Sequence, residues 1–309
     1  MAEVATSMSS SAHSSARSDQ LLVVVDPVAR RLDGESVRIA KDVLSAGAAH
    51  TKVCLPDSPE EFARALGRRG SRRPVVIGDD SALLRTVALL HRRRELAGCA
   101  LSVVPVGSAL GLARSLGLPT GAVAAARAVL DGAERRLDLL VDDSDGVVLG
   151  AVGIPPPPVP VPVRERAETH AGAGHGTEPD GPGPVRPWLR TCQSLVRTLA
   201  ASRPARTAVA PGAAGPARLR VEVDGTTLVD LDRPVAAVTV MPGAGGVAVV
   251  EVRPLPADAQ AAPLTASGRT VTVSGAHFRY RADAVVCGPV GTRTWVAREG
   301  AWGLTLPAG

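Results

Sequence analysis

Short apolar runs alternate with amphipathic segments over the first part of the chain. The apolar runs span residues 21–25, 51–55, 74–77 and 101–104. A run that is apolar at successive positions is typical of a strand buried on both faces of a parallel sheet. The segments between them repeat apolar residues at helical spacing, at 36–46, 58–66 and 82–94. The pattern predicts an α/β fold with a doubly wound parallel sheet.

The pattern changes near residue 137. From residue 217 onward, short β-branched runs are separated by turn residues such as Asp224-Gly225, which predicts a C-terminal β-sandwich domain. We therefore expect an α/β domain over 20–137 and a second domain over 138–309. Low-complexity composition predicts three irregular segments, a disordered tail, a Pro/Gly-rich insertion and a linker, at 1–19, 155–187 and 203–216. A short helix is expected at 188–201.

Composition narrows the classes of partner. Aromatic residues make up only 2% of the chain, so the core must be built from Val, Leu and Ala. The net charge is +5, and almost all of the positive charge is carried by Arg. The Arg clusters suit either a solvated surface or contact with an anionic surface. Nucleic acid is disfavoured, because aromatic residues for base stacking are nearly absent. The sequence leaves open whether the chain forms a homodimer.

Cysteine spacing argues against disulfides and zinc, and hydropathy argues against a membrane span and a signal peptide. The four cysteines show no C-x-x-C spacing, so neither a disulfide framework nor a zinc site is expected. No apolar run reaches the roughly 18 residues needed to span a bilayer, and residues 1–20 lack the apolar region of a signal peptide. We expect a cytoplasmic protein or one peripheral to the inner face of the membrane.

Polar and glycine residues follow several of the predicted strands. Asp26, Gly78-Asp79-Asp80-Ser81 and Gly107-Ser108 all come directly after an apolar run. Ligands of open α/β sheets bind at the carboxyl ends of the strands. A glycine loop that opens a helix presents N–H groups to phosphate, and a nearby carboxylate can hold Mg²⁺. The alternative for each loop is a simple turn.

Two segments resemble motifs of the diacylglycerol kinase catalytic domain, which is related to the NAD kinases. Residues 75–87 resemble its G-G-D-G-T-L-x-x-V segment, and residues 105–119 resemble P-L-G-T-G-N-D-F-A-R-x-L-G-I-P. The positions identical in the second motif are Pro105, Gly107, Ala113, Arg114, Leu116, Gly117 and Pro119. Weaker similarities to family segments occur in the same order along the chain, at 23–27, 136–139 and 219–225, the last resembling a segment that ends in Asp-Gly-Glu. The A-R-x-L-G-x-P pattern favours the lipid kinases over the NAD kinases.

The resemblance implies ATP-dependent transfer of phosphate to a hydroxyl of diacylglycerol or a similar lipid at a membrane surface, with ATP and Mg²⁺ as cofactors. Carried over position by position, it gives Asp80 and Asp224 catalytic roles and Asp138 and Asp80 a metal-binding role. The positions expected to bind the nucleotide are Asp26, Gly78, Ser81, Gly107 and Ser108.

The chain departs from these motifs at positions that matter for catalysis. Asp79, Ser81 and Ala82 replace the second Gly, the third Gly and the Thr of G-G-D-G-T. Leu110-Gly111 replaces the Asn-Asp pair, and Thr226 replaces the Glu of Asp-Gly-Glu. Two hypotheses therefore stand: a lipid kinase with rearranged contacts, or a catalytically inactive pseudokinase that binds a nucleotide, a lipid or a protein.

Overall fold

The computed structural model describes residues 20–156, 217–255 and 262–308. All of them belong to one compact unit that joins residues 1–157 to 216–309. The predicted tail at 1–19, nearly all of the predicted insertion, the predicted helix at 188–201 and the whole predicted linker at 203–216 lie outside the described residues. No helix in the described ranges is long and apolar enough to cross a membrane.

Four parallel strands form the N-terminal sheet, in the order β2 (His50–Cys54), β1 (Gln20–Val25), β3 (Arg73–Gly78) and β4 (Ala100–Pro105). These are the four apolar runs that the sequence predicts as parallel strands, so these strands and the mixed α/β class are confirmed. Alternate residues of β1 face two different cores: Leu22 and Val24 join one, and Leu21, Val23 and Val25 join the other.

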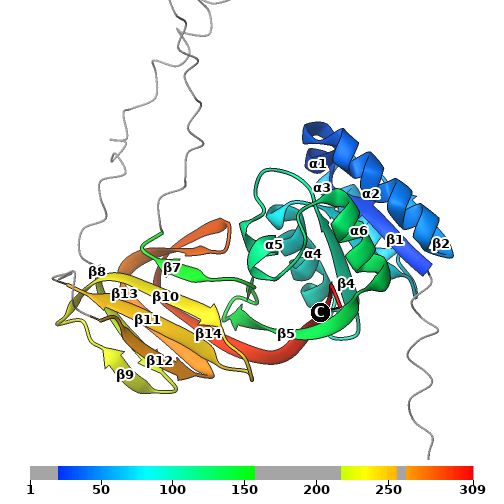
Figure 1. The fold of residues 1–309 in the computed structure, drawn as a ribbon. Helices are drawn as coiled ribbons and strands as arrows, with labels where there is room; N and C mark the ends of the chain where they lie inside the picture. Colours follow the sequence, from blue (N-terminus) through cyan, green and yellow to red (C-terminus); the bar gives the residue numbers. More distant parts are fainter. Residues whose placement is uncertain (1–19, 157–216, 256–261, 309) are drawn as a thin grey trace, which may run out of the picture. The chain divides into compact units, whose positions relative to one another are not determined.

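Helices contribute to both of these cores (Figure 1). Side chains of α3 (Pro59–Gly67) and α4 (Asp80–Arg92) pack with Leu22, whereas α2 (Gly34–Gly47) and α6 (Ala122–Asp131) pack with Leu21. Two shorter helices, α1 (Pro27–Leu32) and α5 (Gly111–Ser115), directly follow Asp26 and Leu110. Of these helices, α1 and α4 begin directly after the carboxyl ends of β1 and β3, where the sequence predicts the site.

The C-terminal region is strand-rich and antiparallel. Its strands are β5 (Ala133–Asp142), β6 (Val147–Val148), β7 (Val152–Ile154), β8 (Ala217–Val223), β9 (Thr226–Val229), β10 (Pro234–Pro242), β11 (Ala248–Pro254), β12 (Leu264–Gly268), β13 (Thr270–Ala282) and β14 (Val285–Leu306). The short strands β7 and β8 both pair with β10 and with β13. The core of this region is built mainly from Val, with Tyr280 and Trp295 in edge-to-face contact.

The last strand differs from expectation. The sequence predicts two short strands, at 284–287 and 294–296, where the structure has the single 22-residue strand β14. Its final residues pair with both β4 and β5. Trp302, Leu304 and Leu306 thereby complete the core that contains Leu22. Alternation of apolar residues near the C-terminus is too short to reveal this, because the partner strands lie more than 150 residues earlier.

Candidate functional site

The two glycine loops meet at the carboxyl ends of β3 and β4. A Cβ atom at Gly78 would lie 2.6 Å from the Cβ of Ala82 and 2.9 Å from the Cβ of Asp26, so only glycine fits there. Gly107 has φ of +131° and lies against Asp79, whose Cβ would be 3.1 Å from an added Cβ. The structure thus brings together three predicted positions, Asp26, Gly78 and Gly107. Ser81 and Ser108 lie on the exposed side of these loops.

Asp79 occupies the N-terminus of α4. Its Oδ1 accepts hydrogen bonds from the backbone N–H groups of Ser81 and Ala82, at 3.0 and 3.2 Å. The first N–H groups of a helix have no partner within the helix and are the groups that bind phosphate in loops of this kind. In this chain, the carboxylate at the position of the family's second Gly has filled that place.

Asp80 joins the two loops. It is 8% exposed, and its carboxylate accepts hydrogen bonds from the N–H groups of Leu112, at 2.8 Å, and Ala113, at 2.9 Å. The backbone N–H of Asp80 also donates to the carbonyl of Ala109. Leu110, the N-cap residue just before α5, has a side chain that cannot cap the helix. Asp80 therefore supplies from a distance the cap that Leu110 cannot provide.

Asp26 is neutralised by a residue that the sequence did not single out. Its carboxylate accepts hydrogen bonds from the N–H groups of Val28 and Ala29 at the start of α1. It is also paired with Arg85, whose Nη1 lies 2.8 Å from Oδ1. Arg85 further lies over the ring of Phe62, 5.4 Å from its centroid. Asp26 and Arg85 are 59 positions apart in the sequence, so no local pattern reveals this pair.

The other two predicted carboxylates bind backbone elsewhere. Asp138 accepts hydrogen bonds from the N–H groups of Gly246 and Gly300, both at 2.7 Å. Asp224, in a turn with φ of +49°, accepts from Arg269 and Thr270 just before and at the start of β13. Asp80, Asp138 and Asp224 share no hydrogen-bond partner. Within the described ranges, no group of three or more His, Cys, Asp or Glu side chains could hold a metal ion.

A carboxylate at the opposite end of β13 approaches the glycine loops instead. Asp283 follows β13, and its carboxylate accepts hydrogen bonds from the N–H groups of Leu149, Gly150 and Ala151 at 2.8–2.9 Å. Gly150 packs against Leu112 of α5, the residue that donates to Asp80. Sequence reasoning missed Asp283, and its only local signal is a turn between two β-rich runs.

Burial raises the pKa of Asp283 above its ordinary value, while the three N–H donors oppose the rise and the charge of Asp80 adds to it. A raised folded-state pKa gives stability that is complete below the unfolded pKa and is lost as the pH rises through the folded one. We expect the free energy of unfolding of the unmodified chain, minus that of Asp283→Asn, to fall as the pH rises above about 4, the ordinary pKa of an aspartate. Urea unfolding at several pH values measures this difference, and a difference that increases with pH would contradict the assignment.

A cavity of about 400 Å³ lies beside α4 and reaches the turn between β13 and β14. Its polar lining includes Ser81, Arg85 and Asp283. The remaining lining is mostly apolar and comes from α4, β6 and the β13–β14 turn: Leu84, Ala88, Val147, Val148, Ala282, Ala284 and Val285. Its volume falls in the range of small-molecule sites, and its combination of apolar walls with a few polar groups is typical of them.

Comparison with known proteins identifies the N-terminal part of the chain. Residues 20–141 match the family model of the diacylglycerol kinase catalytic domain. No curated protein sequence shows significant similarity to the chain.

Solved structures from Bacillus anthracis str. Sterne share the fold. A candidate diacylglycerol kinase has a TM-score of 0.64 at 13% identity, over 93% of this chain and 97% of that one. A structure of a diacylglycerol kinase has a TM-score of 0.61 at 11% identity, over 93% and 97%. At this identity the structures show the fold alone, and the family model adds that residues 20–141 are similar to the diacylglycerol kinase catalytic domain.

Proposed function

We propose that this chain is a lipid-binding member of the diacylglycerol kinase family that has lost phosphotransfer. The observation that carries the proposal is the hydrogen bonding of Asp79 to the N–H groups of Ser81 and Ala82. A polyphosphate at these groups would approach the carboxylate closely. Two unit charges about 4 Å apart repel by roughly 4 kcal/mol at an effective dielectric near 20, which weakens binding roughly a thousandfold.

The residues present do not fit ATP with Mg²⁺ in the arrangement described. The carboxylates of Asp26 and Asp80 are already held by backbone N–H groups and, for Asp26, by Arg85. These hydrogen bonds and the Arg85 charge take up part of the acceptor capacity and of the negative charge that a metal ion would need. No described cluster of metal-binding side chains offers an alternative.

The family's general base also lacks a counterpart. We infer that the turn Asp283-Ala284-Val285, which approaches the glycine loops, corresponds to the Asp-Gly-Glu segment in place of Asp224-Gly225-Thr226. Val285 then stands at the position of the Glu, and the earlier placement puts Thr226 there. Neither side chain can accept a proton from a lipid hydroxyl.

The apolar cavity supports lipid binding. Leu84, Ala88 and Val148 can contact an acyl chain, while Ser81 and Arg85 offer hydrogen bonds to a polar headgroup. Val285 and Val286, next to the cavity, expose 58% and 45% of their surface. These side chains favour entry of the ligand from a membrane surface.

Filling the cavity tests lipid binding. Ala88→Trp places an indole among the lining side chains and is expected to weaken binding of a fluorescent diacylglycerol at least tenfold, because the acyl chain loses its space. Ala124→Trp, at an exposed position of α6, is the matched control and should leave binding unchanged. Equal affinities for the two variants, measured by fluorescence titration, would sink the lipid proposal.

A working lipid kinase is the second candidate, supported by the family match and by the close fit of Gly78 and Gly107. Calorimetry with ATP and Mg²⁺ separates the two. We expect no binding by the unmodified chain and measurable binding by Asp79→Gly, which frees the N-terminus of α4. Asp33→Gly, which removes the same kind of cap from α2, is the control. ATP-dependent phosphorylation of diacylglycerol by the unmodified chain would overturn the loss of phosphotransfer.

A further inference from the structure

A second cavity lies at the opposite end of the N-terminal sheet. It has a volume of about 330 Å³ and is lined by residues at or just before the start of β3 and β4, together with Glu134 of β5 and Thr305 of β14. Because β3 and β4 are six residues long, this cavity is roughly 20 Å from the glycine loops. It is therefore separate from the candidate site described above.

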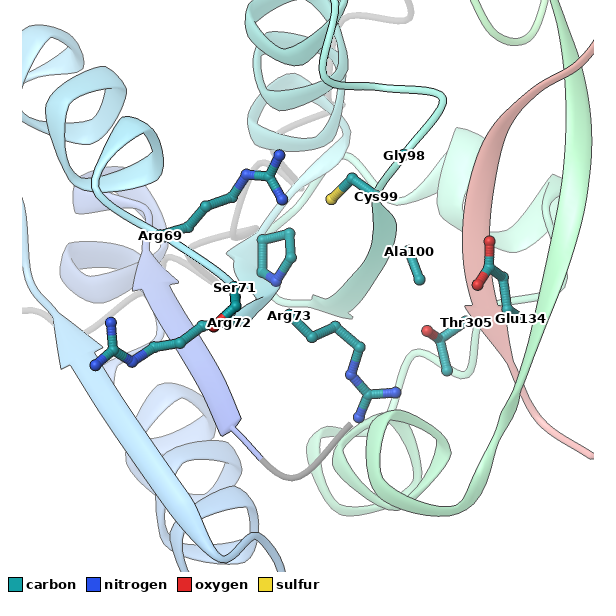
Figure 2. A pocket seen from close by; sticks show the side chains of 10 residues that line it. Arg69, Ser71, Arg72, Arg73, Gly98, Cys99, Ala100, Glu134 and Thr305 are labelled. Atoms are coloured by element: carbon teal, nitrogen blue, oxygen red, sulfur yellow. The ribbon is translucent and has the colours of Figure 1, made fainter. Parts of the chain in front are cut away.

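The cavity is rich in arginine (Figure 2). Arg69, Arg72 and Arg73 line one side, and Cys99, Glu134 and Thr305 belong to the facing elements. Arg69 is paired with Glu95, 2.8 Å away, so its charge is balanced within the chain. Arg72 makes no side-chain hydrogen bond or ion pair with any described residue, and in Figure 2 its guanidinium points outward from the other side chains.

The proposal below depends mainly on the hydrogen bonding of the Arg73 side chain. Its Nη2 donates to the carbonyl of Val129 in α6, at 2.6 Å. Its Nε is buried and has no hydrogen-bond partner among the described residues. A buried donor without a partner is energetically unfavourable. Burial also lowers the pKa of Arg73, while the charge of Glu134 opposes this.

We propose that this cavity binds a small phosphate-bearing anion, with Arg73 as its principal ligand and Arg72 folding in from the rim. Guanidinium groups form paired, charge-assisted hydrogen bonds with phosphate oxygens, and Arg72 and Arg73 both line this cavity. The volume exceeds that of a bare phosphate ion and suits a phosphate monoester of a small polar molecule.

Glu134 is expected to limit the affinity of this site for an anion. Its carboxylate lines the same cavity, and its negative charge favours the charged form of Arg73. It is only weakly engaged elsewhere, at 3.4 Å from Arg136. An incoming anion is repelled by Glu134, so the site favours anions with enough charge to compete for Arg73. Removing this negative charge must therefore tighten binding.

Calorimetric titration with inorganic phosphate and with glycerol 3-phosphate tests the proposal, with chloride at matched ionic strength as the reference. We expect Arg73→Gln to weaken binding at least tenfold, Arg72→Ala to weaken it severalfold and Glu134→Gln to tighten it roughly tenfold. Arg92→Ala, an exposed arginine outside the cavity, is the matched control and should change nothing.

Using three variants distinguishes a loss of binding from a loss of folding. The Arg72 side chain makes no hydrogen bond or ion pair with a described residue, so a weaker site in Arg72→Ala cannot come from the loss of such a bond. Tighter binding of the monoester than of inorganic phosphate would assign the ligand to the phosphate esters, and equal affinities would assign it to free phosphate. Absence of binding to both, a response equal to that of chloride, or affinities that ignore Arg72, Arg73 and Glu134 would overturn the proposal.

Discussion

Trp302→Ala is expected to lower the free energy of unfolding by about 3–5 kcal/mol. The side chain of Trp302 is fully buried and lies in the core that also contains Leu22, Phe62 and Leu83. Its Nε1 lies 3.4 Å from the carbonyl of Asp138, to which it donates. Urea unfolding followed by circular dichroism measures the change. Leu264→Ala, at a partly exposed position of β12, is the control and should cost much less.

The same core bears on the predicted domain boundary at 137 and 138. Because Trp302, Leu304 and Leu306 belong to it, a fragment of residues 20–137 lacks part of its own hydrophobic core. We expect this fragment to be unfolded or aggregated. A cooperative unfolding transition of the fragment, or a loss below about 1 kcal/mol in Trp302→Ala, would show that β14 is dispensable to the N-terminal sheet.

Asp80→Ala is expected to lower the free energy of unfolding by about 3 kcal/mol in the absence of any nucleotide. The substitution removes the acceptor for the N–H groups of Leu112 and Ala113, leaving α5 without a cap and the Ala113 N–H buried and unsatisfied. Thermal and urea unfolding without ligand give the value. Asp131→Ala, an exposed carboxylate at the end of α6, is the control.

This experiment separates two roles for Asp80. The family resemblance assigns it to catalysis and metal binding, which predicts a loss of activity with little loss of stability. Its hydrogen bonds predict a loss of stability whether or not the chain is active. An Asp80→Ala variant that is as stable as the unmodified chain would favour the catalytic role and weaken the proposal made above.

The N-terminal sheet was predictable from patterns within short stretches of the sequence. The run Leu21–Val25 is apolar at every position and becomes a strand with both faces buried. Ser58-Pro59 marks the start of α3, where the Ser58 hydroxyl accepts from the N–H of Glu61. The glycines at 78 and 107 mark the loops at the carboxyl ends of β3 and β4. Each of these features acts within a few residues of the chain, so a linear pattern can reveal it.

The contacts that decide what the site can do are long-range. The Arg85–Asp26 pair spans 59 residues, Asp80 reaches Leu112 across 32, and Asp283 reaches Leu149 across 134. The sequence supplied the carboxylates but not their partners: Asp80, Asp138 and Asp224 each accept hydrogen bonds from a different pair of backbone N–H groups. Only tertiary structure determined that they hold backbone N–H groups, because hydrogen-bond geometry depends on how distant segments pack rather than on local propensity. The sequence by itself established the four strands of the N-terminal sheet, the glycine loops and the family resemblance.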